Sequence, residues 1–260
     1  HGLSADGMCG PSTYRRINTD RQQMGDFKKY QLKSSSEFIY YRGKPMSIQW
    51  DKVSTHLDPE GLDLVGGRSS YSGKKRDIKF FVNHWDVCLS SDSCVKVLNR
   101  RNISVHFCID NDGTIHQLMD LNDAAWHAGG YSWNHSSIGV EIANAYYPKY
   151  QDWYEKHGFG KRPLVEDQEI HGKSMKPFMD FYPVQKEALK ALWVACHEGL
   201  GIPLEAPETK WAVDPTCKSN KFRGFCSHYH LTRGKIDCAG LDIDKMLEEI
   251  KINPRYCPDK

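Results

Sequence analysis

The sequence KFFVNHWDVCLSSDSC, residues 79–94, joins a short apolar run to a histidine and two cysteines. The run begins at Ile78 and ends at Val82, a length that is typical of a buried strand. His84 follows it, where the rigid backbone of a strand end can hold a side chain toward a cleft. A lone histidine at a strand end is more often structural than functional, so a metal ligand or general base at His84 needs partners elsewhere in the chain.

Outward from this stretch, predicted strands alternate with predicted helices. Residues 92–101 have helical spacing with Val95 and Leu98 inward, and Ser91 or a neighbouring serine caps them. A longer helix is predicted from Pro183 to Gly199, because its apolar residues form one stripe. Further strands are predicted at 104–109, 114–119 and 137–143, and a last helix at 242–250. This alternation predicts an α/β domain with a central mixed β-sheet flanked by helices.

Two segments depart from the alternation. Residues 1–77 contain one recognisable hairpin, at 38–50, which is too little to bury a core of its own. We therefore expect an N-terminal extension that packs on a catalytic domain formed by residues 78–260. Residues 147–183 are aromatic, charged and irregular, and we expect them to form an insertion over the cleft.

The composition excludes several classes of protein. The 260 residues carry a formal net charge of +2, too small to indicate a nucleic-acid-binding surface. No apolar run approaches the roughly 18 residues that a transmembrane helix needs, so we expect no membrane span. Nine cysteines are many for a cytosolic protein. They predict an exported chain, periplasmic or secreted, in which some cysteines form disulfides.

A second polar cluster lies in CSHYHLTRGKIDCAG, residues 226–240. It contains His228, His230, Lys235, Asp237 and Cys238 in a loop that glycine interrupts. Zinc prefers tetrahedral sites made of histidine, cysteine or carboxylate ligands, and catalytic sites leave one position for water. With His84, this loop can supply three such ligands. A solvated polar loop whose cysteines form disulfides is an equally good interpretation of the spacing.

A third element is DAAWHAGGYSWNHSSIGVEIAN, residues 123–144. Glu141 interrupts an apolar strand pattern and shares a face with Gly139 and Ala143 rather than with the large apolar residues. A carboxylate there is either on the surface of an edge strand or in a cleft. In a cleft, desolvation would raise its pKa toward that of a useful general base.

The motifs occur in a recognisable order. His84 is followed by VHFCIDNDGTIHQL (105–118), WHAGG (126–130), SIGVEIAN (137–144) and SHYHLTRGKID (227–237). This order resembles the type-2 N-acetylmuramoyl-L-alanine amidases. That superfamily includes phage amidases, bacterial muropeptide amidases and animal peptidoglycan-recognition proteins. The resemblance covers about residues 79–250.

The resemblance implies one zinc ion per chain. His84 matches the first ligand and His228 the second. The third ligand in the family lies two residues after a lysine, and Lys235 with Asp237 fits that pattern. Cys238, one residue later, is the alternative third ligand.

The resemblance also implies which residues act on the substrate. Glu141 matches the catalytic glutamate, which would accept a proton from water, and Lys235 would stabilise the developing oxyanion. Some relatives use a tyrosine where this chain has Val105, which gives Glu141 more weight. The residues that resemble the substrate-binding cleft are Trp126, His127 and Asn134.

The activity implied is zinc-dependent hydrolysis of the amide between N-acetylmuramic acid and L-alanine, in peptidoglycan or in muropeptides. Two alternatives stay open on the sequence alone. One is a non-catalytic peptidoglycan-binding module, and the other is a zinc amidohydrolase of the same fold that acts on another amide. The presence of Asp237, Glu141 and Lys235 favours the enzyme over the binding module.

Cys88 and Cys94 are separated by five residues and follow His84 closely. Peptidoglycan-recognition proteins look similar in this region. We therefore predict a Cys88–Cys94 disulfide, which would fix the turn that follows His84.

Overall fold

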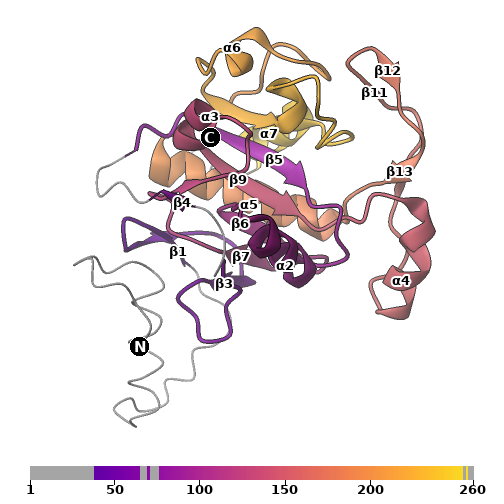
Figure 1. Ribbon diagram of the computed structural model, residues 1–260, viewed down its shortest axis with the longest axis horizontal. Helices are drawn as coiled ribbons and strands as arrows, with labels where there is room; N and C mark the ends of the chain where they lie inside the picture. The colour runs from indigo at the N-terminus through magenta and orange to yellow at the C-terminus, as the bar shows by residue number, and fades with distance from the viewer. Residues whose placement is uncertain (1–37, 65–68, 71–75, 254–255, 257–260) are drawn as a thin grey trace.

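The computed structural model of the chain describes residues 38–64, 69–70, 76–253 and 256. Within these ranges it forms an α/β fold around a six-stranded mixed sheet (Figure 1). The predicted fold class is therefore confirmed. Residues 1–37 of the predicted N-terminal extension lie outside the described ranges. Among the described helices, none combines the length and apolar character needed to cross a membrane.

The central sheet has the strand order β14–β5–β9–β6–β7–β3. Strands β14, β5, β9 and β6 run parallel, β7 is antiparallel to β6, and β3 pairs parallel with β7. The sequence pattern missed the short strands β14 and β3, whereas β6 and β7, equally short, lie within longer predicted strands on either side of the turn at residues 110–113. The strand bounds are Gly224–Ser227 (β14), Phe80–Trp85 (β5), Ser137–Ile142 (β9), Phe107–Ile109 (β6), Ile115–Gln117 (β7) and Val53–Thr55 (β3).

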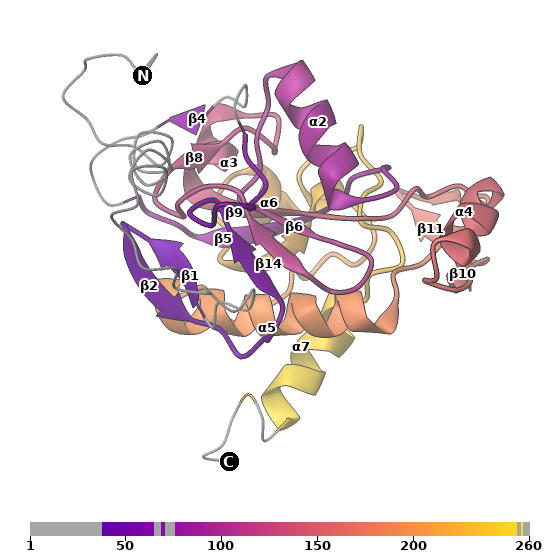
Figure 2. The same ribbon diagram turned by 90° about the horizontal axis from the view of Figure 1, so that it is seen from below.

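Helices cover both faces of this sheet (Figure 2). Helix α5 (Pro183–Leu200) crosses one face and packs against α7 (Ile243–Ile252). Its Trp193 is fully buried, with the ring centroid 5.0 Å from that of Phe225 in β14. Helix α2 (Ser91–Arg101) lies on the opposite face, where Leu98 packs into a smaller apolar cluster. The short helices are α3 (Tyr131–Ser136), α4 (Gln151–Lys156) and α6 (Pro215–Lys218).

The glycine predicted to end α5 has a different role. The helix continues through Gly199 to Leu200, and Gly201, with φ of 72°, forms its left-handed C-terminal cap. A Cβ atom at Gly199 would lie 1.8 Å from the Met46 sulfur. Met46 belongs to the hairpin of β1 (Phe38–Tyr41) and β2 (Lys44–Ser47). Gly199 therefore allows the N-terminal hairpin to approach the helix closely.

Residues 147–183 form a unit beyond the carboxyl ends of β5 and β9 (Figure 1). Arg162 anchors it: the side chain is buried, and its guanidinium lies 4.4 Å from the Tyr154 ring and 4.3 Å from the Tyr182 ring. Arg162 also donates to the carbonyl of Ala143, just after β9, at 2.8 Å. The unit consists of a 3-10 turn (Pro148–Tyr150), α4, the antiparallel strand pair β10 (Leu164–Val165) with β13 (Phe178–Met179), and, between those two strands in sequence, the hairpin β11 (Glu169–Ile170) with β12 (Lys173–Ser174). A buried cation thus fixes the insertion to the central sheet.

Candidate metal and catalytic site

The candidate residues gather where three neighbouring parallel strands end. His84 lies near the end of β5, and Glu141 is its register partner on β9. His228 directly follows β14, the other neighbour of β5. Sites in sheets of this kind form beyond the carboxyl ends of the strands. Residues 84, 141 and 228, distant in sequence, are therefore adjacent because of strand order.

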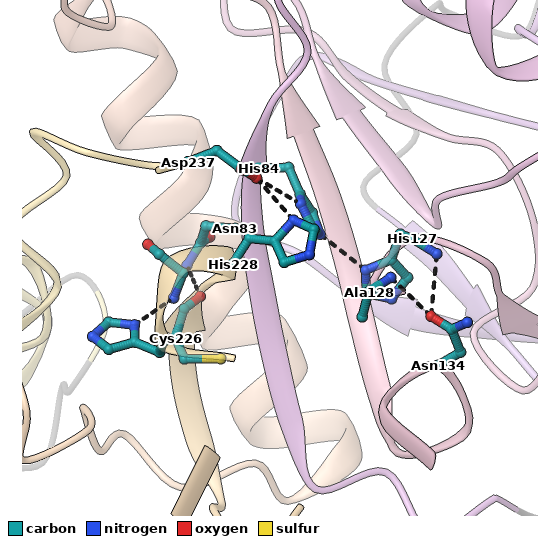
Figure 3. A network of polar contacts seen from close by, with 10 residues as sticks. Asn83, His84, His127, Ala128, Asn134, Cys226, His228 and Asp237 are labelled. Atoms are coloured by element: carbon teal, nitrogen blue, oxygen red, sulfur yellow. Dashed lines mark hydrogen bonds and ion pairs between the residues drawn. The ribbon is translucent and has the colours of Figure 1, made fainter. Parts of the chain in front are cut away.

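A hydrogen-bond relay fixes β5 to β14 beside this site. The side-chain nitrogen of Asn83 donates to the carbonyl of Cys226 at 2.8 Å (Figure 3). The indole nitrogen of Trp193 in turn donates to the Asn83 side-chain oxygen at 3.2 Å. Because Asn83 precedes His84 and Cys226 lies two residues before His228, this relay sets the relative positions of the two histidines.

Asp237 joins the two histidines (Figure 3). Its Oδ2 lies 2.9 Å from His84 Nδ1 and 3.1 Å from His228 Nδ1, and all three residues are buried. One ligand atom from each residue lies within 4.8 Å of the other two. Two imidazoles and a carboxylate are a donor set that zinc accepts, with a fourth position left for water. The structure therefore provides a triad consistent with the zinc site that the sequence predicts.

The charge states of His84 and Asp237 suit a metal. Burial, reinforced by the nearby His228, lowers the pKa of His84 to about 4, so its imidazole is neutral at pH 7. Burial alone would raise the pKa of Asp237, but hydrogen bonds from His228 and His84 outweigh it and hold the pKa below its usual range. A neutral histidine and an ionised aspartate are the forms that bind metal.

The neighbouring cysteine points elsewhere. Cys238, the alternative third ligand, is fully buried in the main apolar core, and burial raises the pKa of its thiol well above the ordinary value. Metal binding by cysteine needs the thiolate. Of the two candidates for the third ligand, the structure brings Asp237 to the histidines.

Glu141 faces the triad from β9. Its Oε2 is buried and has no hydrogen-bond partner among the described residues. Burial raises the pKa of the Glu141 carboxyl well above its ordinary value, and the nearby Asp86 and Asp237 add to this effect. A raised pKa makes the Glu141 carboxylate a stronger base than an ordinary glutamate, which suits a general base.

All eight predicted site residues border one cleft of about 490 Å³. The exposed Lys235 lies at its margin. The predicted substrate-binding residues also line it, but Asn134 is buried, and its side-chain oxygen accepts from the backbone nitrogens of His127 at 3.2 Å and Ala128 at 2.8 Å (Figure 3). Asn134 thus holds the loop, and contact with substrate stays a prediction. The eight residues are His84, Trp126, His127, Asn134, Glu141, His228, Lys235 and Asp237.

His127 makes a contact that the sequence did not predict. Its Nδ1 lies 2.9 Å from His84 Nε2, and its Nε2 lies 3.1 Å from the Ser137 hydroxyl. A partner on the second nitrogen of a metal-ligating histidine fixes the orientation of its ring. His127 is therefore placed to orient His84.

Gly139 makes room for His127, which leads to a testable prediction. A Cβ atom at position 139 would lie 2.6 Å from His127 Nδ1, so Gly139→Ala must displace the ring. We expect this overpacking to lower the free energy of unfolding by about 1–3 kcal/mol, measured by urea denaturation. The double variant with His127→Ala should recover most of that loss, because the clash is gone. Simple addition of the two single losses would show that the clash is with another group.

The sequence analysis also missed Asp86. Its Oδ1 accepts from the backbone nitrogens of Cys88 at 2.8 Å and Asn144 at 3.0 Å, which connects the ends of β5 and β9. Burial raises the pKa of Asp86 to about 7. Asp86 lies two residues after His84 and directly after the end of β5, and continued strand alternation from His84 was the available signal.

The cysteines of the described residues are free thiols, among them Cys88 and Cys94. These two thiols form a hydrogen bond, and Cys94 forms another with Cys108. The Cys88–Cys94 disulfide stays a prediction.

The sequence model of the Amidase_2 family, N-acetylmuramoyl-L-alanine amidase, matches residues 74–207. The matched range includes His84 and Glu141 and ends before His228 and Asp237. No curated protein matches the chain.

Several solved structures are similar to the chain. AmiD of E. coli, bound to anhydro-N-acetylmuramic acid-L-Ala-D-γ-Glu-L-Lys, is 22% identical over 52% of this chain and 48% of its own, with a TM-score of 0.35. AmpDh3 of Pseudomonas aeruginosa, in complex with an anhydromuramic pentapeptide, is 20% identical over 61% and 53%, with a TM-score of 0.35. The endolysin LysCS of Clostridium intestinale is 14% identical over 75% and 97%, with a TM-score of 0.45. The chain thus spans about half the length of AmiD and AmpDh3.

Proposed function

Because the chain belongs to the N-acetylmuramoyl-L-alanine amidase family, we propose that it hydrolyses the amide between N-acetylmuramic acid and L-alanine with one zinc ion per chain. The substrate is peptidoglycan or a muropeptide released from it. The observation that carries the proposal is the meeting of His84, His228 and Asp237 in one cleft with Glu141.

His84, His228 and Asp237 would hold the metal. A zinc ion bound there supplies Lewis acidity toward water and the scissile carbonyl. The chain's own contribution is to keep the three donors fixed, with His84 neutral and Asp237 ionised. The Asn83 relay fixes the strands that carry the histidines, and His127 orients the His84 ring.

Two residues move or stabilise charge during the reaction. Glu141 accepts the proton of the attacking water at its buried Oε2 and returns it to the amine of L-alanine as the amide breaks. Lys235, at the margin of the cleft, places a positive charge near the oxygen on which negative charge develops. Removing either residue therefore affects the transition state more than the binding of substrate.

Hydrolysis of a defined muropeptide tests the proposal. The peptide stem of the ligand in the AmiD structure, L-Ala-D-γ-Glu-L-Lys, serves as the reference. We expect a new L-alanyl amine, detected by mass spectrometry, that disappears with a chelator and returns with added zinc. Binding of purified cell wall without any hydrolysis would instead support the binding module. Comparable cleavage of unrelated acyl-amino acids would support an amidohydrolase of another specificity.

We further propose that the chain is exported, and the cysteines give this a test. On oxidation, Cys88 is expected to pair with Cys94, because their thiols are hydrogen-bonded to each other. Cys196 is the internal control: it is fully buried, its thiol pKa is raised by burial alone, and we expect it to stay reduced. Non-reducing peptide mapping of protein recovered from the periplasm or medium should show the 88–94 cross-link. Recovery of both cysteines as free thiols would rule out the predicted disulfide.

A further inference from the structure

A second cavity of about 760 Å³ lies beside the catalytic cleft, between the hairpin β11–β12 and the loop of residues 232–236. We call it the cationic groove and define it by Tyr146, Tyr147, Lys173, Lys176, Arg233 and Ile236. Lys235 borders the catalytic cleft, whereas its neighbours Arg233 and Ile236 border the groove. Lys235 and Ile236 are consecutive residues, and consecutive Cα atoms are about 3.8 Å apart. The two cavities therefore lie on either side of this one loop.

The groove has one sign of charge. Lys173, Lys176 and Arg233 line it, and none of its lining residues is an aspartate or glutamate. All three cations are exposed, and none forms an ion pair with another described residue. Elsewhere on the insertion the pattern differs, since Lys161 pairs with Glu155 at 4.0 Å. Cations gathered in a concave surface without acids attract an anionic ligand.

The walls of the groove are fixed to the catalytic strands. His171, at the tip of the β11–β12 hairpin, has its Nε2 2.9 Å from the carbonyl oxygen of Lys235. Tyr146, four residues after the end of β9, stacks on Phe178 of β13 with ring centroids 5.4 Å apart. Because the groove and the catalytic cleft share these elements, a ligand can occupy both in a defined relative position.

We propose that the cationic groove binds the carboxylates of the peptide stem while the amide to be cleaved lies in the catalytic cleft. The inference rests on the proposed function and adds the recognition of the leaving peptide. A γ-linked glutamate keeps a free α-carboxylate, and the stem ends in another, whereas the N-acetylated sugar is neutral. The stem is therefore the part of the substrate whose charge matches the groove. Two or three extended residues of the stem span roughly 7–10 Å, which is enough to reach from the catalytic cleft across the loop of residues 232–236 to the groove.

The test uses Lys173→Gln/Lys176→Gln, which removes two exposed charges, one on β12 and one just after it, without touching the catalytic cleft. Its matched control is Lys218→Gln/Lys221→Gln, an equal change in charge at exposed residues that line neither cavity. Each variant is assayed on the reference muropeptide and on the same muropeptide with its carboxylates amidated. We expect the groove variant alone to raise KM for the acidic substrate about 3–10-fold, with kcat unchanged.

The amidated substrate should show no such difference between variant and wild type. Added salt should also reduce the difference on the acidic substrate, because exposed charges are screened. Equal effects of the two double variants, or equal effects on the two substrates, would overturn the proposal.

A failure of the proposed function would be visible separately. If the wild type cleaves neither substrate, binding of free L-Ala-D-γ-Glu-L-Lys is measured by NMR titration. Binding that is weakened by Lys173→Gln/Lys176→Gln, and not by the control, would support the groove as a stem-peptide site without catalysis. No binding of the tripeptide to the wild type would overturn it.

Discussion

Replacement of Glu141 by glutamine is expected to lower kcat/KM for the muropeptide by about 10²–10⁴-fold, the usual contribution of a positioned general base. Glutamine keeps the shape of the side chain but cannot accept the proton of water. Its neutral amide also removes a charge that burial and the nearby Asp86 and Asp237 already disfavour. The variant should therefore fold at least as stably as the wild type, so the loss is one of catalysis.

Zinc content and a surface control complete this measurement. Glu141→Gln should retain the zinc content of the wild type, because the triad of His84, His228 and Asp237 is intact. Glu248→Gln, at an exposed position of α7, should retain full activity. A general base usually accelerates a reaction by at least about 100-fold. If Glu141→Gln kept more than about a tenth of the wild-type activity, another group would therefore have to be the base.

Replacement of Asp237 by alanine is expected to abolish stable zinc binding, and activity with it. Loss of a partner in the outer shell of a zinc site costs about 10–100-fold in affinity, and loss of a direct ligand should cost more. Asp237 has a second function, because its carboxylate accepts hydrogen bonds from both histidines. Metal analysis by mass spectrometry after dialysis should show one zinc in the wild type and little in the variant.

Cys238→Ala is the matched control, one residue away. Its side chain is fully buried in the apolar core, so the variant should lose about 1 kcal/mol of stability and keep its zinc. Zinc lost with Cys238→Ala and kept with Asp237→Ala would transfer the third ligand to the cysteine. Zinc kept in both variants would place the metal elsewhere.

The fold was largely predictable because the main elements are long enough to show a period. The apolar run before His84 predicts β5, and the stripe on residues 183–199 predicts α5 within one residue of its end. What sequence periodicity could not give is strand order. Strand β14 has four residues, GFCS, and its pairing with β5 is what brings His228 beside His84.

The candidate site was predictable in its members and not in its contacts. Motif order indicated the eight residues that share the cleft, whereas the family match alone ends at residue 207, before His228 and Asp237. The contact of His127 with His84 depends on Gly139, whose missing side chain leaves space across the strand. An absent atom has no signature in a hydrophobic pattern. The roles of these residues stay predictions until they are tested.

The buried Arg162 has a consequence for whether this segment can be exchanged. Insertions between a strand and a helix are usually regarded as exchangeable modules. Here Arg162 belongs to the inserted segment, and its guanidinium donates to the carbonyls of Ala143 and Asp180 and to the side-chain oxygen of Gln185. Ala143 follows β9 and Gln185 lies in α5, so Arg162 connects the insertion to both flanking elements. Deleting residues 147–183 would leave the carbonyl of Ala143 without this donor, two residues from Glu141. An engineered chimera should therefore transplant the segment together with its contacts at β9 and α5.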